Sequence, residues 1–151
     1  MRILVDGDAS PQINEISILT KKYHKELIVY SDTHHMHQGD YQIIICDQGR
    51  DSVDHKIIND VRSGDLVITQ DYGLASYVLL KNAYVLHVSG KMINQDNIDA
   101  LLMQRYLGVK ERKANKHIKG PKKRTKETEI FFTQQLENIL RGENNEKIYI
   151  L

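Results

Sequence analysis

The chain has 151 residues, of which 40% are hydrophobic, and this suits one folded domain with a sizeable core. Its 21 Lys and Arg against 20 Asp and Glu leave a formal charge of +1, so the overall charge does not indicate a nucleic-acid-binding protein. A single cysteine, Cys46, excludes an internal disulfide, and no apolar stretch is long enough for a membrane span or a signal-peptide core. We therefore expect a soluble, cytoplasmic protein without a membrane partner.

The first third of the chain predicts three strands and one helix. Residues 3–5 form a short apolar run that ends at Asp6, as in a buried parallel strand. Apolar residues at three- and four-residue spacing then predict a helix over 11–23, with Ser10 as its candidate N-cap. Two further apolar runs predict strands over 27–30 and 41–46.

The middle of the chain continues the alternation of helices and strands. The pattern predicts a helix over 53–61, a strand over 66–69, a helix over 74–80 and a strand over 84–88. Strands that alternate with helices favour a three-layer α/β/α fold. We expect a mainly parallel, five-stranded sheet that helices cover on both faces.

Beyond a predicted helix over 94–106, the character of the sequence changes. Residues 110–126 contain nine Lys or Arg and one Glu, a local charge of +8, which leaves about −7 for the rest of a chain whose total is +1. A final amphipathic helix is predicted over about 128–140. The tail, 142–151, ends in an apolar segment suited to an edge strand or to contact with a second subunit in a homo-oligomer.

Five aspartates are expected to meet at one edge of the sheet. Asp6, Asp8 and Asp71 follow predicted strands, and ligands of open parallel sheets bind outside the carboxyl ends of the strands. Asp51 and Asp54 are three residues apart at the start of a helix, within one turn of each other. Neighbouring carboxylates repel one another unless a cation lies between them. We therefore predict a metal site formed by these five residues.

Oxygen ligands favour Mg²⁺ or Mn²⁺, and the corresponding chemistry is attack of a metal-activated water on a phosphodiester. Asp6, Asp54 and Asp71 are the candidate catalytic residues. The competing explanation is that Asp6, Asp51 and Asp71 cap helices or loops, where aspartate is common. Asp47 and Asp65 are weaker candidates, and Asp65 starts its strand and so lies at the opposite edge of the sheet.

Four sequence blocks resemble one protein family. They are DGDASP at 6–11, DSVD at 51–54, GDLVITQDYGLA at 64–75 and KGP at 119–121. They resemble the YaiI/YqxD family of bacterial proteins, which is related in fold to PIN-type nucleases, over about residues 1–140. The resemblance implies a PIN-like domain over 1–141 in which the matching acidic residues bind metal for ribonuclease chemistry. The family usually has Ala and Cys where this chain has Gly7 and Ser10, so a role for that cysteine does not carry over.

The basic residues near the predicted site are candidate contacts to RNA. Lys and Arg neutralise backbone phosphates and give salt-dependent affinity, although a solvated charged loop is an equal alternative. The candidates are Arg105, Lys119, Lys122, Lys123 and Arg124.

A histidine cluster and an aromatic residue are weaker candidates. His34, His35 and His37 are dense enough to suggest a transition-metal site, but they have no nearby cysteine or clear carboxylate partner, and unliganded loop histidines are the favoured interpretation. Tyr72, directly after Asp71, is placed either to contact a substrate or to pack.

The sequence favours a metal-dependent nuclease or phosphodiesterase, with two alternatives. The first is a non-catalytic module that keeps the fold and binds RNA or protein through its basic segment. The second is a haloacid-dehalogenase-like phosphatase, which also begins with a strand and Asp-x-Asp. That motif continues to Thr or Val where this chain has Ser10, so this alternative ranks third.

Overall fold

The computed structural model describes the chain except for residues 33–38, 48, 50, 115–123 and 143–151. Three features singled out in the sequence lie outside the described residues: the histidine cluster, the lysine candidates and the apolar end of the tail. They are His34, His35, His37, Lys119, Lys122, Lys123 and residues 147–151. In the rest of the chain, no helix combines the length and apolar character needed to cross a membrane.

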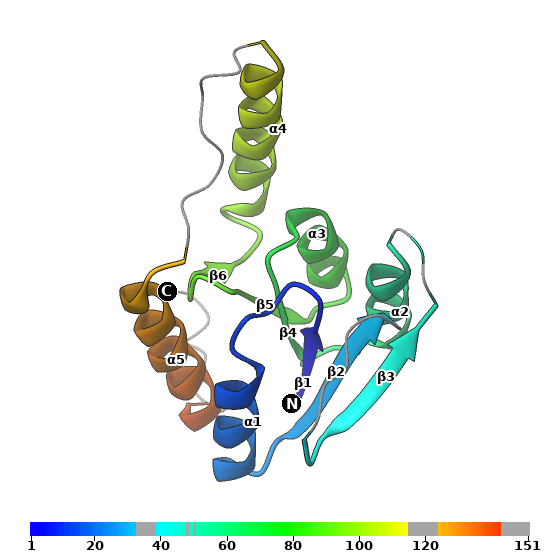
Figure 1. Ribbon diagram of the computed structural model, residues 1–151, viewed down its shortest axis with the longest axis vertical. Helices are drawn as coiled ribbons and strands as arrows, with labels where there is room; N and C mark the ends of the chain where they lie inside the picture. The colour runs from blue at the N-terminus through cyan, green and yellow to red at the C-terminus, as the bar shows by residue number, and fades with distance from the viewer. Residues whose placement is uncertain (33–38, 48, 50, 115–123, 143–151) are drawn as a thin grey trace.

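Six strands of the described chain form one sheet (Figure 1). They are β1 (Arg2–Asp6), β2 (Glu26–Asp32), β3 (Gln42–Cys46), β4 (Leu66–Thr69), β5 (Tyr84–His87) and β6 (Met92–Ile93). Their order is β3-β2-β1-β4-β5-β6, and every neighbouring pair is parallel except β5 and β6. The five predicted strands are confirmed. The two-residue β6 is additional, because so short an apolar run gives no strand pattern.

The centre of the sheet is made by β1 and β4, whose apolar sequences are nearly continuous. Leu4 of β1 lies between Ile28 of β2 and Val67 of β4, and all three are buried. Strands that are buried on both faces carry apolar residues at every position instead of alternating. Because β1 and β4 are parallel and in register, their last residues, Asp6 and Thr69, lie at the same edge of the sheet.

Helices cover both faces of the sheet. They are α1 (Ile13–Lys22), α2 (Ser52–Asp60), α3 (Tyr72–Leu80), α4 (Ile98–Ala114) and α5 (Lys126–Arg141). On one face α1 packs against α5, and Ile16 and Leu136 share an apolar cluster with Ile3 of β1. On the other face, Ile57 of α2 and Val78 of α3 belong to a second cluster. The predicted three-layer α/β/α arrangement is confirmed (Figure 1).

Helix α4 departs most from its predicted bounds of 94–106. It begins later because two asparagines form a reciprocal turn before it: Asn94 Oδ1 accepts the backbone N–H of Asn97 at 3.1 Å, and Asn97 Oδ1 accepts that of Asn94 at 3.0 Å. It also continues to Ala114, so the first part of the basic segment is helical. Its first turn, which includes the buried Ile98, lies where α4 packs against α3, and the remainder of the helix stands away from the sheet (Figure 1).

The start of α5 is tied to both neighbouring elements. Thr125 caps the helix, because its Oγ1 accepts the backbone N–H of Thr128 at 3.2 Å. The preceding residue, Arg124, donates from its guanidinium to the carbonyl of Val88 at 2.6 Å and to the side chain of Gln12. These bonds join the first turn of α5 to the end of β5 and the start of α1.

Candidate functional site

Asp6 ends β1 and is a buried member of the predicted acidic cluster, with 6% of its surface exposed. Thr69 Oγ1, at the end of β4, donates a hydrogen bond to Asp6 Oδ2 at 3.3 Å. Burial raises the pKa of Asp6 from 3.8 to about 6; the Asp8 and Asp71 carboxylates add to the rise, and the Thr69 bond opposes it. The Asp6 carboxyl group therefore resists ionisation in the protein alone.

Asp8 is exposed, and its carboxylate is held at the end of β2. Its Oδ1 accepts a hydrogen bond from Ser31 Oγ at 3.0 Å, and its Oδ2 accepts the backbone N–H of Asp32 at 3.2 Å. Asp32 is the last residue of β2 and was not predicted as a site residue. The predicted strand stopped at Tyr30, so the strand-end rule was applied two residues too early.

Asp51 and Asp54 lie at the start of α2. Asp51 has a left-handed backbone, with φ of 66°, and its side chain makes no capping hydrogen bond, so helix capping does not account for it. Asp54 is half-buried. The pKa of Asp54 is raised from 3.8 to about 7. The largest cause is burial, the next is a hydrogen-bonding interaction with Asp71, and repulsion from Asp71, Asp6 and Asp51 adds to the rise. These causes place Asp54 close to the other aspartates.

Asp71 follows β4 and has two structural roles as well as its place in the cluster. Its Oδ1 caps α3 by accepting the backbone N–H groups of Gly73 at 2.8 Å and Leu74 at 3.2 Å. Its own backbone N–H donates to Thr69 Oγ1 at 3.1 Å. Arg105 of α4 forms an ion pair with the same carboxylate, with 3.6 Å between Nη1 and Oδ1. Capping and a functional role are therefore compatible at this residue.

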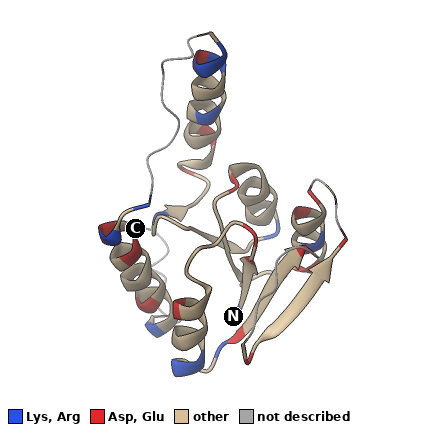
Figure 2. Ribbon diagram, in the orientation of Figure 1, with Lys and Arg blue, Asp and Glu red and all other residues tan. Residues whose placement is uncertain are grey.

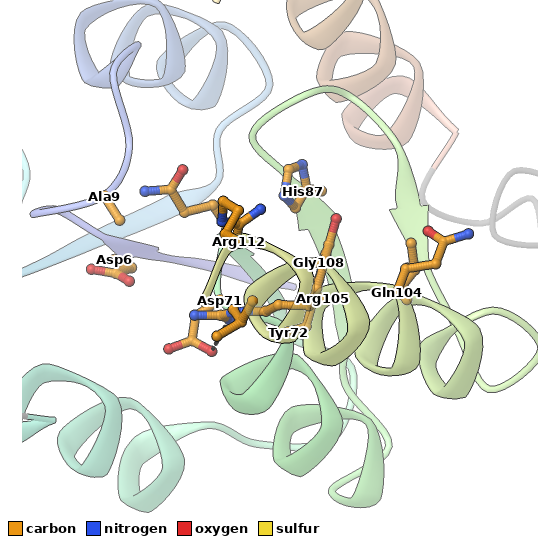
Figure 3. A pocket seen from close by; sticks show the side chains of 12 residues that line it. Asp6, Ala9, Asp71, Tyr72, His87, Gln104, Arg105, Gly108 and Arg112 are labelled. Carbon is orange, nitrogen blue, oxygen red and sulfur yellow. Dashed lines mark ion pairs between the residues drawn. The ribbon is translucent and has the colours of Figure 1, made fainter. Parts of the chain in front are cut away.

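The carboxylates line two adjoining pockets at the carboxyl edge of the sheet. The acidic pocket, about 190 Å³ in volume, is lined by Asp6, Asp8, Asp32, Asp51 and Asp54. The arginine pocket, about 830 Å³, shares Asp6 with it and also contains Asp71, Arg105 and Arg112 (Figure 3). Four of the five predicted metal ligands thus share one pocket, and the fifth, Asp71, borders the next.

The acidic pocket has the donor chemistry of a site for a hard divalent cation. Its acidic side chains offer only carboxylate oxygens, which Mg²⁺ and Mn²⁺ prefer. The raised pKa values of Asp6 and Asp54 arise partly from repulsion that a cation would relieve. Among the described residues, no three His, Cys, Asp or Glu side chains are arranged to hold a metal ion as they stand. The donors fit the ion, and they must draw closer to bind it.

Two arginines of α4 border the arginine pocket. Arg105 was predicted as a phosphate contact, and its ion pair with Asp71 places it at the site. Arg112 was missed because the predicted helix ended at residue 106. Seven residues, about two helical turns, separate it from Arg105, so both lie on one side of α4. A β-carbon added at Gly108 would lie 3.3 Å from Arg112 Nη1, so glycine leaves room for this side chain (Figure 3).

His87, the last residue of β5, was also missed. Its Nδ1 accepts the backbone N–H of Ser89 at 3.0 Å, which assigns the proton of the neutral ring to Nε2. Burial, followed by the charges of Arg124 and Lys91, lowers the pKa of His87. Tyr72 packs on the imidazole, with 5.3 Å between ring centroids, and both residues line the arginine pocket (Figure 3). The strand-end rule that selected the aspartates also applies to this histidine.

The residues that were left out of the site lie elsewhere. Asp65 starts β4 at the opposite edge and forms an ion pair with Arg2 at 2.7 Å. Burial opposes ionisation of Asp65, but its hydrogen bonds from Arg2 and the Arg62 backbone outweigh burial and hold its pKa below the ordinary value. Asp47 lines a separate pocket beside Cys46. Cys46 is buried at the end of β3 as predicted, and burial raises the pKa of its thiol.

The predicted acidic ligands and the predicted basic contacts to nucleic acid lie in different parts of the molecule. Figure 2 shows acidic residues in the loops at the carboxyl edge of the sheet and basic residues toward the far end of α4. Arg124, a predicted nucleic-acid contact, is instead close to the body of the domain, where its guanidinium bonds to Val88 and Gln12. Its contact with nucleic acid stays a prediction.

Comparison with known proteins identifies the family. A family model described as uncharacterised, YaiI/YqxD, matches residues 4–142. A UPF0178 protein of Clostridium kluyveri is 41% identical to this chain, over 99% of this chain and 97% of its own length. A UPF0178 protein of Alkaliphilus oremlandii is 43% identical, over 97% of this chain and 99% of its own length. Rae1 (YacP) from Bacillus subtilis is a solved structure with 16% identity and a TM-score of 0.47, covering 95% of this chain and 99% of that one. The chain belongs to the YaiI/YqxD family.

Proposed function

We propose that this protein is a metal-dependent nuclease or related phosphodiesterase that acts on RNA. The observation that carries the proposal is the acidic pocket, where strand ends and a helix start bring together carboxylates from separate parts of the chain. A pocket with two arginines adjoins it and supplies charge for backbone phosphates. RNA is the substrate that the resemblance to PIN-type nucleases implies.

Metal binding would involve the five predicted aspartates. They are Asp6, Asp8, Asp51, Asp54 and Asp71. When bound, a Mg²⁺ or Mn²⁺ ion supplies Lewis acidity, which acidifies a water molecule and offsets charge on the phosphate. The Thr69 hydroxyl orients Asp6 by its bond to Oδ2. The capping bonds from Gly73 and Leu74 fix the Asp71 carboxylate relative to α3.

Asp54 holds a proton near neutral pH in the metal-free protein, where burial and the neighbouring carboxylates raise its pKa to about 7. A bound cation would lower this pKa, so Asp54 would then serve as a charged ligand. Arg105 and Arg112 contribute separately, by binding phosphates along the arginine pocket.

Metal-dependent cleavage of RNA tests the proposal. Metal-free protein is incubated with single-stranded and structured RNA, and Mn²⁺ or Mg²⁺ is then added. We expect cleavage by the wild type, a loss of at least about 100-fold in Asp54→Asn, and little change in Asp47→Asn. Asp47→Asn is a matched control, since Asp47 is exposed and lies outside the acidic pocket. Equal inertness of the wild type and Asp54→Asn would count against the proposal.

A non-catalytic RNA-binding module is the second candidate. It is favoured by the finding that, in the described part of the chain, no three potential ligands are arranged to hold a metal ion as they stand. Calorimetry with Mn²⁺ distinguishes the two. Binding that Asp6→Asn and Asp71→Asn abolish favours the enzyme, and salt-sensitive RNA binding without metal binding favours the module.

A further inference from the structure

A third pocket lies beside the arginine pocket, and the proposed catalytic chemistry makes no use of it. It has a volume of about 660 Å³ and is formed by the loop after β1, the turn after β5 and the start of α5. We call it the α5 pocket. It shares Ala9, Gln70 and His87 with the arginine pocket, and Ala9 and Asp8 with the acidic pocket. The three pockets therefore surround one loop, that of residues 7–11.

Two residues that line the α5 pocket each carry a buried polar side-chain atom without a hydrogen-bond partner. The atoms are Ser10 Oγ and Arg124 Nε, and they are the two buried side-chain nitrogen or oxygen atoms of the described residues in this state. Ser10 is only 8% exposed. It was the candidate N-cap of α1, but α1 begins at Ile13 and the hydroxyl is left free. Buried polar groups without partners are costly, so a ligand in the pocket that either atom reaches by a small side-chain rotation would relieve this cost.

The lining selects for an anion. The Arg124 guanidinium is held in place by its bonds to Val88 and Gln12, so its Nε–H is a fixed, positively charged donor. His87 carries its ring proton on Nε2 and also lines the pocket. The N-terminal end of α5, a helix of 16 residues, adds partial positive charge through the helix dipole, and Thr125 caps the backbone N–H of Thr128 there.

Acidic residues near the pocket oppose this character in part, because the charges of Glu129 and Glu15 act on Arg124. Glu127 and Glu129, in the first turn of α5, are exposed and are not part of the pocket lining. Asp8 lies on the lining, and its carboxylate accepts hydrogen bonds from Ser31 Oγ and the Asp32 backbone.

We propose that the α5 pocket binds a phosphate group of the nucleic-acid strand that is processed in the acidic pocket. Ser10, Arg124 and the start of α5 would supply the donors. This inference rests on the proposed function for the identity of the strand, and on Ser10 and Arg124 for the anion. Because the pockets share walls, a phosphate held here fixes which bond of the strand reaches the carboxylates.

Phosphate binding by metal-free protein in EDTA tests the anion site without any catalysis. Inorganic phosphate is titrated while backbone amide NMR signals of the α5 start and of residues 7–11 are followed. We expect Ser10→Ala to weaken phosphate binding by about 10-fold to 100-fold, the effect of one hydrogen bond to a charged group. Ser63→Ala, an exposed serine outside the pocket, is the matched control and should leave the affinity unchanged.

Stability of the same variant separates binding from folding. Ser10 Oγ makes no hydrogen bond, so Ser10→Ala removes no internal bond and should raise or preserve the midpoint of urea unfolding. Weaker phosphate binding together with unchanged or higher stability supports the site. Equal phosphate affinity in Ser10→Ala and wild type, or no binding to either, overturns it, whether or not the protein cleaves RNA.

Oligoribonucleotides then identify the source of the phosphate. Two strands of the same sequence, one with a 5′-phosphate and one with a 5′-hydroxyl, are compared in the wild type and Ser10→Ala. A Ser10 effect confined to the phosphorylated strand assigns a terminal phosphate, and an equal effect on both assigns an internal one. If inorganic phosphate binds but neither strand shows a Ser10 effect, the assignment to a nucleic-acid strand is wrong. Loss of RNA cleavage in Asp54→Asn is measured separately and tests the proposed function alone.

Discussion

The Thr69 hydroxyl donates a hydrogen bond to Asp6 Oδ2 at 3.3 Å and thereby fixes the carboxyl group that ends the neighbouring strand. The same oxygen accepts the backbone N–H of Asp71 at 3.1 Å. One buried side chain thus connects the acidic pocket with the arginine pocket. Residue 69 is completely buried, so its contribution can be tested by an isosteric substitution.

We expect Thr69→Val to raise the pKa of Asp6 above its value of about 6, because the bond that favours the ionised form is lost. The free energy of unfolding should fall by about 1–2 kcal/mol, since the Asp71 N–H and the Asp6 carboxyl group lose a partner. NMR titration of the Asp6 carboxyl carbon and urea unfolding measure the two effects. Thr69→Ser keeps the hydroxyl and should leave the pKa of Asp6 near its wild-type value; an equal rise in both variants would contradict the assignment.

The raised carboxyl pKa values predict how stability depends on pH without metal. Asp6 titrates at about 6 and Asp54 at about 7 in the folded protein, against 3.8 as the ordinary value. The folded state therefore binds more protons between pH 4 and 7, and stability is lost as pH rises through this window. Asp6 alone accounts for about 3 kcal/mol on this scale. Urea unfolding in EDTA at pH 5 and pH 8 measures the change.

Asp54→Asn should flatten this pH dependence and stabilise the metal-free protein at pH 8. The lowered pKa of His87 acts in the opposite direction, so the informative quantity is the difference between Asp54→Asn and the wild type. Asp47→Asn should keep the wild-type slope, since Asp47 is exposed and outside the acidic pocket. A slope that Asp54→Asn leaves unchanged would show that crowding of carboxylates is not its source.

The sequence predicted those features of the site that depend on local pattern. Asp6 and Asp71 each follow an apolar run, and the direction of parallel strands is enough to place them at one edge. The same rule applied to correct strand ends would have added Asp32 and His87. Those two were missed because β2 runs two residues beyond its predicted end and because a histidine within an apolar run resembles a packing residue.

The remaining features depend on contacts between distant residues. Threonine is common in strands, so nothing in the sequence distinguishes Thr69. Its hydrogen bond to Asp6 depends on the pairing of β4 with β1. Arg112 required a helix that continues past Gly108, which propensity alone disfavours. The free hydroxyl of Ser10 became visible only when α1 was found to begin at Ile13.

Metal binding should stabilise the protein more at high pH than at low pH. Protons and cations compete for the same carboxylates, of which Asp54 is half protonated near pH 7. We expect Mn²⁺ or Mg²⁺ to raise the melting temperature at pH 8, with a smaller effect at pH 5. Differential scanning calorimetry at several metal concentrations measures it. Asp6→Asn should abolish the shift and Asp47→Asn should retain it; shifts of equal size in both variants would place the metal elsewhere.

Arg105 offers a separate test of the nucleic-acid surface. Its side chain is 55% exposed and its ion pair with Asp71 is long, so Arg105→Ala should change stability by less than about 0.5 kcal/mol. The same change removes one phosphate contact. It should weaken RNA binding about 3-fold to 10-fold at moderate salt and reduce the slope of log affinity against log salt by about 1.

Fluorescence anisotropy with labelled RNA, in EDTA and at several salt concentrations, measures this slope. Arg62→Ala is the matched control, because Arg62 is exposed beside the start of β4, at the edge of the sheet opposite the pockets. If Arg105→Ala and Arg62→Ala give the same slope as the wild type, the RNA does not pass along α4. If only Arg105→Ala lowers the slope, the RNA strand lies in the arginine pocket. Arg112→Ala should then lower the slope by a similar further amount, because both arginines border that pocket.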